Sequence, residues 1–240
     1  MGPLVSRGGA VTLRPVRVRD AKNWSDLRIR NQNSLLPWEP TGVGSWAERH
    51  QPASWPPLYA VLKSEAKRGT ILPFVIEVDG HYVGQLTVGN IQRGAVRTAW
   101  IGYWIDQAHF GQGIATAAVA LGVDHCFGPV GLHRLEATVQ PSNGASQAVL
   151  TKLGFRREGL LERYMDVNKR WRDHILFALT AEEIPEGAVL PGDHELMARF
   201  GVSRTVLREA MKTLAAKQLV AAKARVGTSV RPREDWNFVD

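Results

Sequence analysis

The pattern of hydrophobic and polar positions predicts alternating strands and helices over about the first 180 residues. Residues 11–17 alternate as a half-buried strand does, and Asp20 is placed to cap a helix that runs to about Arg30. A second helical pattern, residues 46–68, is interrupted by three prolines. The first strand is therefore followed by two helical segments.

Three strands are predicted next, in an order typical of an antiparallel meander. Residues 71–78 and 81–91 flank Asp79-Gly80, a strong hairpin signal, and an apolar, aromatic strand follows at residues 99–105. The remaining elements are a helix at residues 114–127, a strand at 134–139, a helix at about 145–153 and a strand pair at 155–165 and 171–179. The order βααβββαβαββ predicts an α/β (α+β) domain with a mixed central sheet.

Composition narrows the class of protein. About 44% of the 240 residues are hydrophobic, but no run of about 18 apolar residues could span a bilayer, and residues 1–10 lack the apolar centre of a signal peptide. We therefore expect a cytoplasmic protein without membrane contact. The single cysteine, Cys126, leaves neither an internal disulfide nor a metal-ligand spacing, so its expected role is core packing and no metal is predicted.

The net charge of +7 is unevenly distributed along the chain. Residues 1–180 carry all of this excess, which suits an anionic cofactor or an acidic partner, whereas residues 181–240 hold nine basic and nine acidic side chains. Within residues 190–233, however, nine basic residues stand against three acidic ones. That local excess suits nucleic acid, although a basic face is more often simply solvated.

A glycine-containing loop joins the strand at residues 99–105 to the helix at 114–127. Glycines let the backbone approach an anion closely, while unpaired N–H groups and the helix dipole present positive charge to it. We therefore interpret the loop as a phosphate-binding site made by Phe110, Gly111, Gln112, Gly113, Ile114, Ala115 and Thr116. A tight turn that needs glycine for steric reasons alone is the alternative.

Six spaced motifs give this order of elements a family resemblance. They are GYWI before the loop, HRLEATV at residues 133–139, NGAS at 143–146, LGF at 153–155, Glu158-Gly159 and WRDH at 171–174. Over about residues 9–180 the chain resembles the RimJ/RimL branch of the GNAT superfamily, whose members acetylate N-terminal α-amines of ribosomal and other proteins. The resemblance implies a GNAT fold, N-acetyltransferase activity and acetyl-CoA, releasing coenzyme A, as the cofactor.

The resemblance also assigns parts of the coenzyme A site. The loop N–H groups would hold the pyrophosphate, although Phe110 stands where the family usually has Arg or Gln. The strand carrying Tyr103, Trp104 and Ile105 would splay from its neighbour and pair with the pantetheine arm, with an N–H near Ile105 stabilising the oxyanion formed on attack. Tyr103 and Trp104 can equally be core aromatics.

The same resemblance points to residues that handle the thiolate. Ser146, which in the family lies beside the sulfur, would protonate the departing thiolate, or else it only caps its helix. The tyrosine acid of the related RimI branch would fall at Leu150, which has no hydroxyl. Asn143 would bind either coenzyme A or the local turn, and we favour the cofactor.

The chemistry of the acceptor limits what base is needed. An N-terminal α-amine with a pKa of about 7.7 to 8 is already partly neutral near pH 7, so a weak base suffices. The candidate bases are Glu136, Asp166 and Glu162, each of which can equally be a solvated surface carboxylate. Met165 occupies the position of the glutamate found in RimL-like enzymes.

For the substrate, residues 36–39 lie where the family's helix-linking loop covers the acceptor. Trp38 and Glu39 are therefore the expected contacts, with Glu39 pairing with a substrate ammonium. A surface carboxylate is the alternative for Glu39.

From Leu190 the sequence resembles a different family, the winged helix-turn-helix of GntR-type regulators, most like their FadR-like branch. Residues 195–200 would form the first helix of the motif, 201–202 the turn, 204–214 the recognition helix and 225–227 the wing. The residues that match the DNA contacts of that family are Arg204, Thr205 and Arg208. A basic amphipathic helix that only packs is the alternative.

This second segment is expected to be incomplete. The helix that precedes it in GntR domains has no place, because residues up to 180 complete the acetyltransferase, and the chain stops where a FadR-like effector domain would start. We therefore expect an acetyltransferase at residues 1–180, a junction at 181–189 and a partial winged helix-turn-helix at 190–240. A segment of this size would need support from the acetyltransferase or from a second copy in a homodimer.

Three functions are compatible with these patterns. The favoured one is acetyl transfer from acetyl-CoA to a protein N-terminal α-amine, of the ribosomal-protein-alanine type, by direct attack in a ternary complex. A DNA-binding regulator that senses acyl-CoA through its GNAT fold accounts for Arg204 and Arg208 but not for Ser146. A small-molecule amine acetyltransferase also fits, because the glycine loop carries no information about the acceptor.

Overall fold

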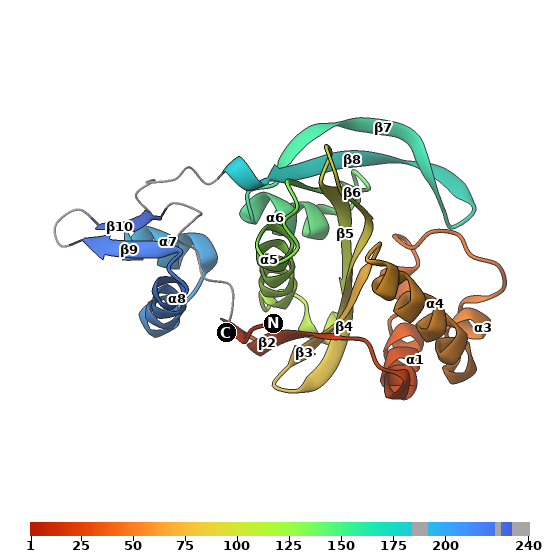
Figure 1. Cartoon of the computed structure of the whole chain (residues 1–240). Helices are drawn as coiled ribbons and strands as arrows, with labels where there is room; N and C mark the ends of the chain where they lie inside the picture. The colour runs from red at the N-terminus through yellow and green to blue at the C-terminus, as the bar shows by residue number, and fades with distance from the viewer. Residues whose placement is uncertain (184–191, 224–226, 232–240) are drawn as a thin grey trace.

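An eight-stranded sheet forms the centre of the computed structural model, which describes residues 1–183, 192–223 and 227–231 (Figure 1). The spatial order is β1-β2-β3-β4-β5-β6-β8-β7, and only β5 and β6 are parallel neighbours. The strands are β1 (Leu4–Ser6), β2 (Gly9–Pro15), β3 (Leu72–Val78), β4 (His81–Gln92), β5 (Thr98–Ile105), β6 (Arg134–Val139), β7 (Arg156–Val167) and β8 (Arg170–Thr180). The predicted mixed sheet is confirmed, with β1 as an additional edge strand.

Helices cover both faces of the sheet (Figure 1). On one face lie α5 (Ile114–Phe127) and α6 (Gly144–Lys152), and on the other lie α1 (Ala21–Arg30), α3 (Trp46–His50) and α4 (Trp55–Arg68), with the short α2 (Gln32–Leu35) following α1. The larger core fills the space between the sheet and α5, where Ile114, Val119 and Leu135 are fully buried. No helix in the described ranges is long and apolar enough to cross a bilayer.

A smaller aromatic core lies on the opposite face of the sheet. The rings of Trp24 and Trp55 are 5.2 Å apart, and His50 lies 5.4 Å from Trp24 with its Nδ1 2.8 Å from the Trp46 carbonyl oxygen. Burial, together with the nearby charge of Arg28, lowers the pKa of His50 to about 4. The imidazole is therefore neutral in the folded protein near pH 7.

The helical pattern at residues 46–68 is divided into two helices rather than one. α3 begins at a capping box in which Ser45 and Glu48 bond each other's backbone N–H groups, and it ends at Gln51, whose backbone is extended. α4 then carries its two prolines in the first turn, where their missing N–H groups cost no helical hydrogen bond. It ends at Gly69, which has a φ of 72°.

The predicted cap at Asp20 is wrong in its chemistry although the position is right. Asp20 stands at the N-cap of α1 but accepts no hydrogen bond from that helix. Its carboxylate is instead held by the guanidinium of Arg14 at 2.8 and 2.9 Å and by the N–H of Arg17 at 2.7 Å. A bidentate charged partner is the stronger competitor, and here it joins β2 to the start of α1.

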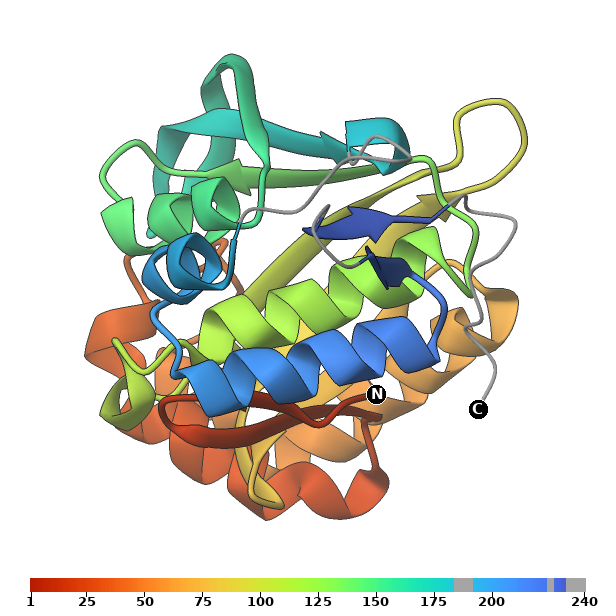
Figure 2. The ribbon, with the colours of Figure 1, turned by 90° about the vertical axis from the view of Figure 1, so that its left-hand side faces the viewer.

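The C-terminal residues form a helix-turn-helix with a short strand pair. α7 (Asp193–Phe200) ends at Gly201, which has a φ of 64°, and α8 (Arg204–Ala216) is capped by Ser203. β9 (Val220–Lys223) and β10 (Gly227–Val230) pair antiparallel, while residues 225 and 226 of the predicted wing lie outside the described residues. α8 runs along the outer side of α5 (Figure 2).

Before this segment, the chain stays attached to the sheet past the end of β8. Ala181 is buried, and its N–H donates to the His133 carbonyl oxygen at 2.9 Å. The carboxylate of Glu182 lies 3.0 Å from the imidazole of His133. Residues 181–183 therefore belong structurally with the sheet.

Candidate active site

The two parallel strands at the centre of the sheet separate after three residues. β5 and β6 are paired only from Thr98↔Arg134 to Trp100↔Glu136, and beyond Trp100 the residues of β5 pair on their other edge with β4. We call the opening between the two strands the wedge. The N–H of Asp106 donates to Val83 on β4, so alternation along the strand turns the N–H groups of Ile105 and Tyr103 into the wedge. The wedge therefore offers unpaired peptide groups to an extended ligand.

Side chains of β5 alternate between the two faces of the sheet. Tyr103 and Ile105 pack in the larger core on the side of α5 and α6. Trp104 faces α1 instead, where the Arg28 guanidinium lies 4.5 Å from its ring and its Nε1–H donates to Gln85 at 3.2 Å. The Trp104 side chain therefore packs against the smaller aromatic core.

The glycine loop before α5 has the geometry of an anion site. Gly111 and Gly113 have φ angles of 73° and 81°, and a Cβ at Gly111 would meet no atom within 4 Å. Within the described part of the chain, no acceptor is recorded for the backbone N–H groups of residues 111–116, and the first paired N–H of the helix is that of Ala117. Phe110 is 54% exposed and adds no polar group. The unpaired backbone donors of the loop are contributed by Gly111, Gln112, Gly113, Ile114, Ala115 and Thr116.

A buried carboxylate fixes the start of this loop. Asp106 is 1% exposed and is bonded by Arg30, by the side chain of Asn31 at 2.9 Å and by the N–H of Ala108. Burial opposes its ionisation, but these bonds outweigh burial and lower the pKa of Asp106. The side-chain Oδ1 of Asn31 accepts from the N–H of Gln107 at 2.8 Å, so the residue that ends α1 holds the loop in place.

Two hydroxyl groups meet at the edge of the wedge. Ser146 Oγ lies 3.0 Å from Tyr103 Oη, which joins the first turn of α6 to β5. Burial raises the pKa of Tyr103 to about 12, partly offset by its hydrogen bond with Ser146, so the phenol stays protonated near neutral pH. Asn143 caps α6 by accepting from the Ser146 N–H at 3.1 Å, so the local turn engages the Asn143 oxygen and Ser146 is not the capping side chain.

Among the described residues, no recorded contact joins Glu136 or Asp166 to Ser146. Glu136 lies where the wedge closes and is paired with Arg134 at 2.7 Å. Asp166 accepts from the hydroxyl of Thr41 at 2.9 Å near the tip of the β7–β8 hairpin. Of the two, Asp166 has no cationic partner in the described structure.

Two neighbouring hollows lie between the loop after α2 and the tip of the β7–β8 hairpin. The first hollow, of about 300 Å³, is lined by Asn33, Leu36, Pro37, Trp38, Gln140, Ser142, Val167, Asn168 and Arg172. Gln140 and Ser142 follow β6 directly, so the first hollow borders the carboxyl end of the wedge. The second hollow, of about 210 Å³, shares Leu36 and Asn168 with it. Trp38 thus lines the first hollow, whereas Glu39 lines the second and is paired with Arg28 at 2.8 Å.

The sole cysteine is a core residue, as predicted. Cys126 is fully buried on α5, and burial raises the pKa of its thiol to about 12. A thiol in this state is not a nucleophile near neutral pH.

A second candidate surface lies on α8. The three predicted DNA contacts, Arg204, Thr205 and Arg208, are exposed, while Leu207 of the same helix is buried. The preceding turn is held by two cations of the larger fold: Arg7 donates to the Gly201 carbonyl oxygen at 3.0 Å, and Lys152 donates to that of Phe200 at 3.1 Å. These two contacts join the helix-turn-helix to the acetyltransferase part of the chain.

Comparison with known proteins identifies both parts of the chain. The family model described as acetyltransferase (GNAT) domain matches residues 10–156. Among solved structures, Mycobacterium smegmatis RimJ in complex with CoA-disulfide is similar, with a TM-score of 0.76 and 56% sequence identity, covering 77% of this chain and 88% of that one. The ribosomal protein uS5-alanine N-acetyltransferase of Escherichia coli is 28% identical over 179 residues, which is 74% of this chain and 91% of the relative.

The model of bacterial regulatory proteins of the gntR family matches residues 169–230. The uncharacterized HTH-type transcriptional regulator YieP of Escherichia coli is 53% identical over 58 residues, which is 24% of this chain and 25% of YieP. Part of the gntR match, β8 (Arg170–Thr180), is here a strand of the large sheet. The helix-turn-helix is therefore joined to the sheet within the region that matches the gntR family.

Proposed function

The chain belongs to the acetyltransferase (GNAT) family, and we propose that it transfers the acetyl group of acetyl-CoA to the N-terminal α-amine of a protein. The observation that carries the proposal is the wedge, with the Ser146 hydroxyl at its edge on the side of α6 and the first hollow at its carboxyl end. The name of the uS5-alanine relative, and the coenzyme bound by RimJ, support this choice of acceptor and donor.

The residues present fit coenzyme A. The unpaired N–H groups at residues 111–116 and the N-terminus of α5 suit its pyrophosphate, and the N–H groups of Tyr103 and Ile105 suit the amide-bearing pantetheine arm. When bound, acetyl-CoA supplies an activated acyl group as a thioester. Ile105 would place an N–H donor at the developing oxyanion, as an oxyanion hole does.

Ser146 would donate a proton toward the departing sulfur. Its Oγ lies 3.0 Å from the Tyr103 hydroxyl, and this hydrogen bond orients the serine hydroxyl. Ser146 would thus serve as the acid although Leu150 stands where a tyrosine acid occurs in a related branch. We infer that Ser146 is the acid and that Tyr103 positions it.

The amine would attack the thioester directly in a ternary complex. The single cysteine is buried with a raised pKa, which excludes it as an acyl carrier. An α-amine with a pKa of about 7.7 to 8 needs little assistance to become neutral. We favour Asp166 over Glu136 as the base, because Glu136 is paired with Arg134 whereas Asp166 bonds only the neutral hydroxyl of Thr41 among the described residues.

A peptide series tests the proposal. Purified protein with acetyl-CoA is offered peptides with a free N-terminus, the same peptides with a blocked N-terminus and one internal lysine, and the polyamine spermidine. Release of free thiol together with mass analysis should show acetylation of the free α-amine alone. Acetylation of spermidine or of the lysine side chain, with none at the α-amine, contradicts the proposal.

A second function is favoured by α8. We propose that Arg204, Thr205 and Arg208, exposed on a helix of the gntR type, contact duplex DNA. Gel-shift titration of the full chain with several duplexes tests this. Binding that is both sequence-selective and weakened by salt supports it, and absence of binding at low salt contradicts it.

A further inference from the structure

The two hollows beside the wedge carry an excess of positive charge. Arg172 is the sole ionisable residue that lines the first hollow. The second hollow is lined by Arg49, Lys169 and one carboxylate, Glu39, which is already paired with Arg28. Within the described residues no ion pair is recorded for any of these three cations.

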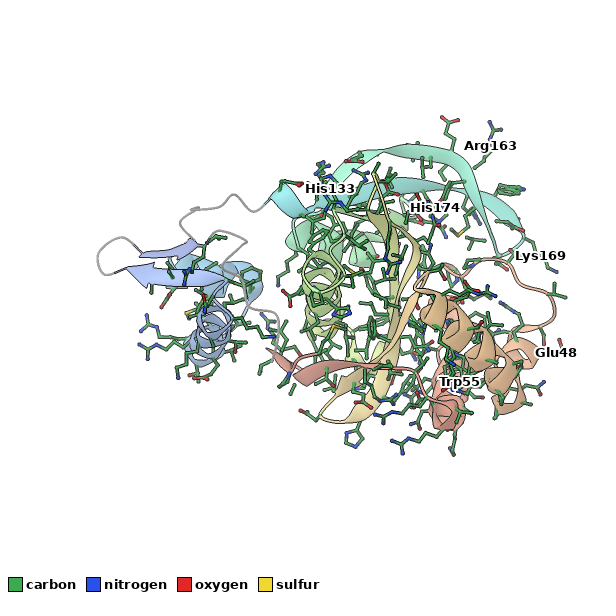
Figure 3. All side chains as sticks on the ribbon, viewed as in Figure 1. Glu48, Trp55, His133, Arg163, Lys169 and His174 are labelled. Atoms are coloured by element: carbon green, nitrogen blue, oxygen red, sulfur yellow. The ribbon has the colours of Figure 1, made fainter. Side chains whose placement is uncertain are left out.

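Three carboxylates of the surrounding elements are engaged in hydrogen bonds, and two of them border the second hollow, because they bond Thr41 and Ser45 of its lining. Asp166, on the strand that leads to the hairpin tip, accepts from Thr41, and Asp173 on β8 accepts from the Arg163 N–H. Glu48 on α3 is bonded to the Ser45 N–H at 2.7 Å. Figure 3 shows Lys169 at the tip of the hairpin, with Glu48 beyond it on α3.

Uncharged polar groups next to Arg172 add hydrogen-bonding capacity to the first hollow. Asn33, Gln140, Ser142 and Asn168 line the same hollow and contribute amide and hydroxyl groups without charge. A guanidinium binds a carboxylate through two parallel hydrogen bonds, and neighbouring amide N–H groups can bind the remaining oxygen lone pairs. A second cation brought to this site would instead be repelled by Arg172.

We propose that these hollows bind the residues that follow the acetylated amine and select an acceptor with Asp or Glu at those positions. The inference rests on the proposed transfer to a protein N-terminus and names the class of that protein: one with an acidic segment directly after its first residue. Linear polyamines, which carry several ammonium groups, are disfavoured by the same cations.

The expected selectivity is moderate because Arg172 and Lys169 are exposed to solvent. Exposed ion pairs contribute about 0.2–1 kcal/mol each, which corresponds to a change of up to about fivefold in kcat/KM per acidic residue. Screening shortens the range of such pairs to about 10 Å at 0.1 M salt. The preference should therefore shrink as salt is raised.

The test compares peptides of one length and one N-terminal residue, with Asp, Ser or Lys at the second and third positions. For the full chain we expect kcat/KM to fall in the order Asp, Ser, Lys, with each step about two- to fivefold. In the doubly substituted Arg172→Gln, Lys169→Gln chain the three peptides should be acetylated at similar rates. In Arg172→Glu the order should reverse.

Arg170→Gln is the matched control, because this exposed arginine lies on the same hairpin but lines neither hollow. It should keep the order seen with the natural chain. Equal kcat/KM for the Asp and Ser peptides in the natural chain overturns the inference and leaves the proposed function intact. So does a preference for Asp that survives the double substitution. If no peptide is acetylated but spermidine is, the proposed function falls and this inference falls with it.

Discussion

Replacing Ser146 by alanine tests the hydroxyl pair at the wedge most directly. The capping of α6 comes from Asn143, so removal of the serine hydroxyl leaves the helix start intact. A hydrogen bond to a charged group contributes about 1.5–3 kcal/mol, and each 1.36 kcal/mol is tenfold in rate. We therefore expect kcat to fall about 10- to 150-fold, with the KM for acetyl-CoA nearly unchanged.

Tyr103→Phe removes the partner hydroxyl while keeping the ring in the core. The lost hydrogen bond is neutral and contributes about 0.5–1.5 kcal/mol, so kcat should fall about two- to twelvefold. In a Ser146→Ala background the same change should have little effect, because both hydroxyls act along one path. Since the pKa of Tyr103 is about 12, its ionisation should not appear in the pH profile of kcat below about pH 10.

The assay is steady-state release of free thiol at saturating peptide, with Thr151→Ala, an exposed position on the same helix, as the control. Natural kcat in Ser146→Ala refutes the role of Ser146 as the acid. An effect of Tyr103→Phe that is equally large in both backgrounds refutes the coupling of the two hydroxyls. Ser146→Thr, which keeps a hydroxyl, should recover part of the lost rate.

Three further predictions concern stability and the second surface. Since the pKa of His50 is lowered to about 4, the unfolded chain takes up the proton first, so the free energy of unfolding should fall by up to about 3 kcal/mol as the pH drops from about 6.5 to 4. Denaturant titrations of His50→Asn should show a flatter dependence on pH. A chain that ends after Glu183 should keep kcat within about twofold of that of the full chain. A chain that ends at Thr180 should melt about 2–5 °C lower than the one that ends after Glu183, because it loses one buried hydrogen bond to the sheet. If α8 binds duplex DNA, Arg204→Ala and Arg208→Ala should each reduce the slope of log affinity against log salt by about one, and an unchanged slope counts against a phosphate contact.

Most of the helices, strands and turns of the fold were predictable from patterns among neighbouring residues. The hairpin at Asp79-Gly80 and the glycine loop were readable because each depends on backbone conformations that few residues adopt, and Gly80 and Gly113 do have positive φ angles. The starts of α3 and α4 also follow local chemistry: a capping box begins α3, and a pair of prolines lies in the first turn of α4. Helices, strands and turns that depend on residues adjacent in the sequence can therefore be predicted from it.

Contacts between distant segments were not predictable in this way. Asn31 and Asp106 are separated by 75 positions, and no periodicity links them, although together they hold the glycine loop. Tyr103 and Ser146 are 43 positions apart, and their hydrogen bond became apparent only from the geometry of the wedge. The ion pair of Glu136 with Arg134, by contrast, was predictable from the sequence. Arg134 stands two residues before Glu136, so the two side chains lie on the same face of one strand.

Alternation along β5 explains how one strand can serve two substrates. Its successive side chains point to opposite faces, so Tyr103 reaches Ser146 on the side of α6 while Trp104 stacks on Arg28 on the side of α1. The peptide groups of the same residues line the wedge between these two faces, since β6 pairs with β5 only as far as Trp100. In the proposed reaction the donor is bound through the wedge and the acceptor approaches from the hollows, and both meet at the backbone of this strand. Direct attack then needs no movement of an acyl group across the protein, which agrees with the absence of an exposed thiol on the single cysteine.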